Sequence, residues 1–147
     1  MARFDNPDFE RLAESLCESL ECVSARSFSL VFDGELPVTV GLHPNDTAVS
    51  IDVWCCDLEP QAGAQRRLIV NALLRLNHAA WPGQSLRLAM DSRGFVLLHG
   101  QREMTRLGGD AFPGWLMWHV EQGRRVRDLS RSLALSVHGE VARFAGC

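Results

Sequence analysis

The residues AGAQRRLIVNALLRLNHAA, positions 62–80, form a helical pattern that stops at Trp81, Pro82 and Gly83. Apolar or small side chains recur in it at the spacing of one buried helix face, at Leu68, Ile69, Ala72, Leu73, Leu76, Ala79 and Ala80. Leu74 adds an apolar side chain on the polar side, which indicates a helix that touches more than one surface. Because strand patterns flank this helix, we expect it to lie between two hairpins and to pack on their sheet.

The sequence before this helix predicts one further helix and three strands. A helix is expected over about 7–20, because Asn6 can cap it and Pro7 suits the first helical position. Apolar residues alternate over 27–32, 35–42 and 48–54, with turn residues between these runs, which predicts an antiparallel meander. Pro37 cannot donate a ladder hydrogen bond, so we expect an edge position or a bulge there.

The sequence after the central helix predicts two strands and a last helix. The strands cover about 85–90 and 95–98 on either side of a turn, and the helix covers about 112–135. The run 95–98 is apolar on both faces, which is typical of a central strand. The predicted fold class is therefore α+β, an antiparallel five-stranded sheet with three helices in the order α-β-β-β-α-β-β-α. We expect one domain over 1–147, with an ordered core of about 7–135.

Composition indicates an ordinary soluble protein. The chain has 147 residues, of which 46% are hydrophobic and 22% charged, and its net charge is -3. This charge gives no case for nucleic acid, and four arginines of the last helix, Arg124, Arg125, Arg127 and Arg131, are expected to form a solvated flank. No apolar run approaches the roughly 18 residues of a spanning helix, and the N-terminus lacks a signal core. We therefore expect a cytoplasmic protein with no membrane partner.

The sequence holds no pattern of catalytic or metal-binding residues. It has no glycine-rich phosphate loop, HExxH, GxSxG or CxxC motif. The five cysteines lie at irregular spacings, which favours reduced thiols over disulfides or a metal site. The five histidines have no ligand spacing, and each is expected at the surface or at a helix cap. We predict no catalytic residue, no metal and no cofactor.

The element order and four local stretches resemble one protein family. These stretches are the opening helix FERLAESL at 9–16, the meander from Leu30 to Val53, LNHAAW at 76–81, and the Gly94 turn between two apolar strands. Over about residues 7–135 the chain resembles the class I type III secretion chaperones, the Tir-chaperone family. The resemblance implies a homodimer that binds the N-terminal segment of a cognate secreted effector in an extended form, keeping it soluble, partly unfolded and competent for secretion. The pI of about 5.9 departs from the strongly acidic character usual in that family.

Two sets of site residues are expected. Apolar surface beyond the needs of one helix face predicts a dimer interface at Leu73, Leu76, Ala80, Trp81, Leu86 and Leu88. The resemblance implies that the effector wraps the other half of the molecule, with candidate contacts at Leu12, Leu16, Val40, Ile51 and Trp54. Trp54 stands on the polar side of its strand, so it is either covered by a helix or exposed for binding, and both interpretations stay open.

Two other functions fit the same pattern of elements. A hot-dog-type thioesterase or acyl-binding enzyme also wraps an antiparallel sheet around a long helix and dimerises. Such an enzyme needs a carboxylate at the helix or an adjoining strand, and residues 62–80 contain no Asp or Glu. The other alternative is a regulatory protein of the secretion-chaperone fold that binds a transcriptional regulator.

Overall fold

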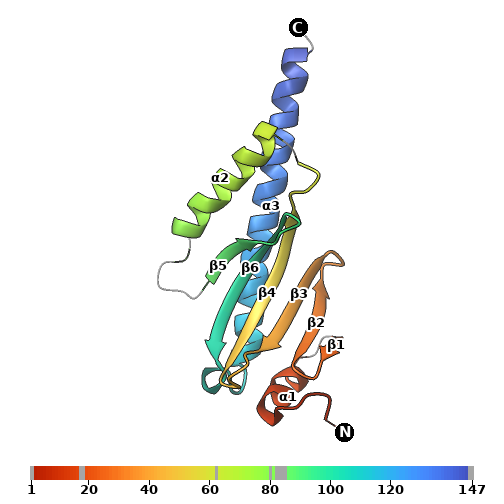
Figure 1. The fold of residues 1–147 in the computed structure, drawn as a ribbon, viewed down its shortest axis with the longest axis vertical. Coiled ribbons are helices and arrows are strands. Elements are labelled where there is room, and N and C mark those ends of the chain that lie inside the picture. Colours follow the sequence, from red (N-terminus) through yellow and green to blue (C-terminus); the bar gives the residue numbers. More distant parts are fainter. Residues whose placement is uncertain (1, 17–18, 62, 80, 82–85, 146–147) are drawn as a thin grey trace.

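The computed structural model describes residues 2–16, 19–61, 63–79, 81 and 86–145, which form three α-helices and one antiparallel sheet (Figure 1). The elements follow one another as α1 (Pro7–Glu14), β1 (Glu21–Ser24), β2 (Ser27–Phe32), β3 (Leu36–Leu42), β4 (Ala48–Asp57), α2 (Gly63–Ala79), β5 (Leu86–Met90), β6 (Phe95–Glu103), the 3-10 turn η1 (Met104–Arg106) and α3 (Ala111–Ala145). Two helix ends differ from the prediction. The first helix ends at Glu14, and the last one continues to Ala145.

The sheet has six strands in the order β1-β2-β3-β4-β6-β5, and every neighbouring pair is antiparallel. The predicted fold class and order of elements are confirmed, except that the prediction had five strands. The missed strand, β1, has all four side chains exposed, so it carries no apolar alternation. The prediction of a central strand after the Gly94 turn is confirmed, because β6 lies between β4 and β5.

One face of the sheet is covered by both α1 and α3. Phe28 pairs with Val40, Val40 with Ile51 and Ile51 with Gly100, and directly paired residues point to the same side. The Phe9 ring of α1 lies 5.5 Å from the Phe28 ring. The α3 helix reaches the same face where its buried His119 packs against Gly100. The opposite face, where Thr39, Asp52 and His99 are half-buried, carries neither of these contacts.

The long helix that covers the sheet, together with α1, is α3. The prediction that the central helix would pack on the sheet was wrong in part, because α2 contacts the sheet mainly at its edge strand β5. Figure 1 shows α3 running along the sheet and continuing past it, with α2 beside the far half of α3 and next to β5. Only Ile69 and Leu73 are buried among the described residues of α2. The larger buried side chains belong to α3, which contributes Phe112, Trp115, Leu116, Val120 and Val126 to the core.

Pro37 fits an internal strand because of where β4 begins to pair. The β3 strand lies between β2 and β4, so it is not an edge strand. Pairing between β3 and β4 starts at Val38, whereas Pro37 pairs only with Val31 of β2 in the described register. Pro37 is therefore open on one side, where its missing donor disrupts no bond to β4.

Three of the four arginines of the predicted solvated flank, Arg124, Arg127 and Arg131, also form ion pairs with the β2–β3 turn, while Arg125 is exposed as expected. The Arg124 guanidinium donates to both carboxylate oxygens of Asp33, at 2.8 and 3.1 Å, and Arg131 donates to Glu35 at 3.1 and 3.3 Å. Arg127 lies between them, 3.6 Å from Asp33 and 3.3 Å from Glu35. The hydrogen bonds from Arg124 hold the pKa of Asp33 below its usual value. The network fixes the turn on the helix.

Candidate partner-binding surfaces

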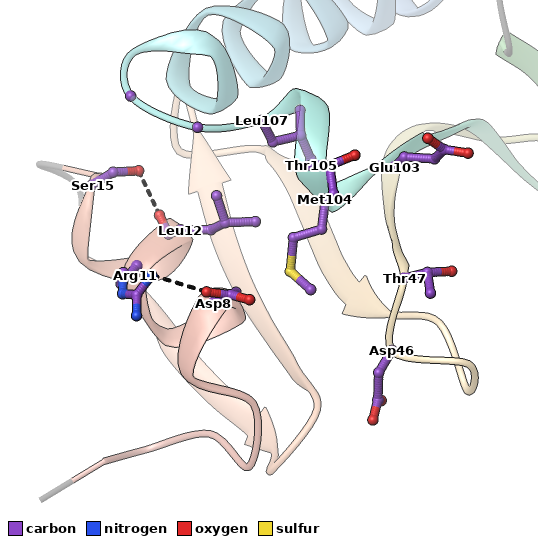
Figure 2. A pocket seen from close by; sticks show the side chains of 12 residues that line it. Asp8, Arg11, Leu12, Ser15, Asp46, Thr47, Glu103, Met104, Thr105 and Leu107 are labelled. Atoms are coloured by element: carbon purple, nitrogen blue, oxygen red, sulfur yellow. Dashed lines mark hydrogen bonds and ion pairs between the residues drawn. The ribbon is translucent and has the colours of Figure 1, made fainter.

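A pocket of about 790 Å³ opens between α1, the β3–β4 turn and η1 (Figure 2). Its apolar side chains are Leu12 of α1, Met104 of η1 and Leu107 just after it. The Leu12 side chain points across the pocket toward Met104 in Figure 2. The pocket thus has apolar walls from two elements that lie far apart in the sequence.

Short-range contacts fix the helix that carries Leu12. The Asn6 side-chain oxygen accepts hydrogen bonds from the N–H groups of Asp8 and Phe9, at 2.9 and 3.1 Å, which caps α1. The Phe9 ring stands edge-on to Phe4, with centroids 5.1 Å apart. The Glu10 carboxylate accepts the Phe4 N–H at 2.8 Å. Because the residues before α1 are tied to its first turns, Leu12 is held in a defined place beside the pocket.

The rim of the pocket is acidic. Asp8 pairs with Arg11 at 2.9 Å, and Asp46 forms an ion pair with Arg26. Glu103 also lies on the rim and has no ion-pair partner in the described part of the chain. A pocket that combines a few apolar side chains with an unneutralised carboxylate at its mouth suits an apolar side chain that is followed or preceded by a basic one.

Trp54 lies on the sheet face opposite α1 and α3. Its indole N–H donates to the Thr39 hydroxyl at 3.4 Å, and its ring stands edge-on to Phe95 with centroids 6.1 Å apart. Beside it, His99 Nδ1 lies 2.6 Å from an Asp52 carboxylate oxygen. Trp54 is half-buried, so it is neither fully covered nor fully exposed, and its role as a partner contact stays a prediction.

An apolar groove separates α2 from the end of the sheet. It is small, about 130 Å³, and its lining is almost entirely apolar, with Leu58, Val70, Leu73, Leu74, Leu88, Met90 and Val96. Leu74 and Met90 are 61% and 48% exposed. Together with the apolar groove that they line, these two exposed side chains mark a surface that a further chain can cover.

The structure places the residues of the predicted dimer interface in different environments. Leu73 and Leu88 line the groove between α2 and β5, while Leu76 is half-buried beside the core. Trp81 and Leu86 are buried, and the Trp81 indole N–H donates to the Gln122 side chain at 3.2 Å. Ala80 lies outside the described residues. The interface as a set stays a prediction.

The residues of the predicted partner site do not form one surface. Val40 and Ile51 are fully buried under the helices, so within this chain they are core residues. Leu12 lines the pocket beside α1, Leu16 is half-buried nearby, and Trp54 lies on the opposite face of the sheet. Sequence reasoning missed Met104 and Leu107, because the sequence pattern predicts neither helix nor strand between residues 98 and 112. Their spacing of three residues was the available signal for a helical turn.

No group of three or more metal-ligating side chains is present among the described residues. Burial raises the pKa of the Cys55 thiol to about 12, so this cysteine stays protonated at neutral pH.

His119 is fully buried between Trp115 and Trp118, which corrects the prediction of a surface or capping histidine. In the described part of the chain, no helix is both long and apolar enough to span a membrane.

Neither a family model nor a curated protein matches the sequence, whereas solved structures match the fold. The Yersinia pestis type III secretion chaperone SycH, solved with a fragment of YscM2, matches with a TM-score of 0.57 and 19% identity over 81% of this chain and 96% of that chain. The fold is that of a type III secretion chaperone. The chaperone–effector complex HopA1–SchA matches with a TM-score of 0.52 and 14% identity over 82% and 88% of the two chains.

The ExsC–ExsE complex matches as well, with a TM-score of 0.55 and 17% identity over 70% of this chain and 74% of that chain. Each of these structures is a complex with a second protein. The secretion-chaperone fold that the sequence resemblance implied is therefore confirmed. The pocket beside α1, the sheet face at Trp54 and the groove at α2 all lie on this fold.

Proposed function

We propose that this protein is a cytoplasmic type III secretion chaperone that acts as a homodimer. It binds the N-terminal segment of a cognate secreted effector and keeps that segment soluble, partly unfolded and ready for secretion. The observation that supports this most is the secretion-chaperone fold, together with apolar surfaces that one chain leaves open. Binding of this kind needs no reaction, so we infer that the protein is not an enzyme.

The pocket beside α1 is the best candidate for the first contact with the effector. An apolar side chain of an extended segment fits between Leu12 and Met104, and a neighbouring basic side chain meets Glu103. Trp54 offers a second apolar anchor on the other face of the sheet. A segment that uses both must pass around the rim of the sheet, and an extended chain can do this at about 3.3 Å per residue.

The edge strand β1 gives such a segment a place to pair. Among the described strands β1 pairs only with β2, and its four side chains are exposed. An edge of this kind offers backbone N–H and C=O groups to an added strand. Main-chain hydrogen bonds then supply affinity, while the pocket and Trp54 select side chains.

The groove between α2 and β5 is the best candidate for the dimer contact. The α2 helix and the β5 strand lie far from α1 in Figure 1, so a second copy bound between them leaves the proposed effector pocket beside α1 free. Leu74 and Met90 stand exposed beside it, and a symmetric contact covers each of them twice. The free energy gained by burying this apolar surface holds the two copies together.

Co-expression with candidate secreted effector proteins tests the proposal. The cognate effector should co-purify with this protein, and Met104→Glu should weaken their complex by roughly tenfold or more, because it places a charge in an apolar pocket with an acidic rim. Met117→Glu is the matched control, since Met117 is exposed on α3 and lies outside the pocket. Equal binding by both variants would move the effector site away from α1.

A further inference from the structure

A second large groove, of about 740 Å³, lies where β5 and β6 meet the first turns of α3. It shares only Glu103 with the pocket beside α1, and it is separate from the groove at α2. Its chemistry differs from both, because its most distinctive side chains are Arg87, Arg102, Arg106, Trp115 and Trp118. None of the functions considered above uses these residues.

The groove is locally basic on a chain whose net charge is -3. Three arginines line it, against Glu103 as the one carboxylate among its described lining residues. Neither Arg102 nor Arg106 forms an ion pair with a carboxylate in the described part of the chain. Two cations without internal counter-charges, in a concave site, focus a positive potential that attracts an anionic ligand.

The aromatic side chains of the groove are held in place. Arg102 stacks over the Trp115 ring, with its guanidinium carbon 5.1 Å from the ring centroid. The Trp115 and Trp118 rings both stand edge-on to the buried His119, at 5.7 and 6.3 Å between centroids. Trp118 remains 37% exposed. A fixed, half-open indole beside arginines is typical of a surface that anchors an aromatic or apolar side chain.

We propose that this groove docks an acidic polypeptide segment that carries apolar or aromatic side chains among its carboxylates. The carboxylates bind Arg102 and Arg106, and an apolar or aromatic side chain packs on Trp118. The volume is sufficient for several side chains, since pockets of roughly 300–1,000 Å³ enclose drug-sized ligands. The net charge of -3 disfavours a long polyanion such as nucleic acid. This inference does not depend on the proposed effector site beside α1.

Binding of a labelled peptide that alternates Glu and Phe, followed by fluorescence anisotropy, tests the proposal. The full-length protein should bind this peptide, and binding should weaken as salt is added. Arg106→Glu should weaken it by about tenfold or more, as expected for loss of a charge-assisted contact plus repulsion. Trp118→Ala should weaken it by about fivefold or more. Met104→Ala, which alters the pocket beside α1 without adding a charge, should have no effect.

Control variants separate the docking of this segment from a nonspecific effect of charge and from loss of folding. Arg93→Glu makes the same charge change at the opposite end of the β5–β6 hairpin and should bind as the wild type does. Arg102→Glu removes a contact with Trp115, so its melting curve is measured alongside, whereas Arg106 makes no described hydrogen bond or ion pair. Wild-type affinity of Arg106→Glu, equal binding of a peptide with Lys in place of Glu, or tighter binding of a single-stranded oligonucleotide would each overturn the proposal.

Discussion

His119 occupies the space that a side chain at residue 100 would need. A Cβ atom built on Gly100 would lie 2.0 Å from Cε1 of His119. The same helix approaches β4 at Gly123, where a Cβ atom would lie 2.4 Å from Cγ1 of Val53. Two glycines, one on the sheet and one on α3, thus let the helix sit close to the buried face.

Gly100→Ala should lower the free energy of unfolding by about 2–3 kcal/mol, because the added methyl group forces the His119 ring or the backbone to move. Urea unfolding measures the change. Gly114→Ala is the control within α3, where a Cβ atom meets nothing within 4 Å, and it should be neutral or slightly stabilising. In the double variant, His119→Ala should recover part of the free energy of unfolding that Gly100→Ala loses. If the effects of the two substitutions on that free energy were fully additive, residues 100 and 119 would not be in contact.

His119 should make stability depend on pH. Burial lowers the pKa of this histidine from 6.5 to about 4, so the folded state binds its proton less readily than the unfolded chain does. The neutral form of His119 therefore makes its full contribution to the free energy of unfolding above the unfolded pKa of 6.5. That contribution is lost as pH falls toward the folded pKa of about 4. Between neutral pH and about pH 5 the free energy of unfolding falls by about 2 kcal/mol because of this group. His119→Leu should flatten this part of the stability profile, and an unchanged slope would assign it to other groups.

Leu74→Glu should separate the proposed dimer without unfolding the chain. Leu74 is exposed in the single chain, and the charge becomes costly only when a second copy covers it. Leu68→Glu, on the same helix but outside the groove, should leave the dimer intact, and Leu73→Glu should unfold the chain because Leu73 is buried. Sedimentation velocity at micromolar concentration gives the oligomeric state. A monomeric wild type would contradict the dimer.

Trp54→Ala should weaken effector binding by roughly 1–3 kcal/mol, as loss of an aromatic anchor does. The melting temperature should change little, because Trp54 lies half-buried on the open face of the sheet. Trp54→Phe keeps an aromatic ring and should restore most of the affinity. Titration calorimetry measures both variants, and wild-type affinity of Trp54→Ala would confine the effector site to the α1 side.

Arg127→Met should lower the melting temperature, because it leaves Asp33 and Glu35 beside each other with less counter-charge. Arg125→Met is the matched control, since Arg125 is exposed on the same helix and forms no ion pair among the described residues. Thermal unfolding compares the two. Similar melting temperatures for both variants would show that the network does not hold the turn.

Local patterns in the sequence were sufficient to predict most of the fold. The Asn6 cap, the alternation through β2, β3 and β4, and the Gly94 turn are short-range signals, and the structure has the expected elements at each. The resemblance to the secretion chaperones came from the order of these elements. The short exposed β1 has no such signal, and neither does the end of α3.

The surfaces depend on contacts between distant residues, which periodicity does not reveal. Val40 and Ile51 look like any apolar strand residues, and only the position of α3 decides that they are core. The ion pairs between Arg124 and Asp33 join residues 91 positions apart. Leu12 meets Met104 only because η1 folds back beside α1. The sequence therefore predicted which face is apolar, but not which element covers it.

The most direct test of the chaperone proposal is hydrogen exchange on the complex with the secreted effector that co-purifies with this protein. The account predicts slower exchange in α1, η1 and the β4 segment around Trp54 of this chain, together with fast exchange across the bound N-terminal segment except where it pairs with β1. A partner that binds through a folded domain, with its N-terminal segment dispensable and α1 and η1 unchanged in exchange, would contradict it.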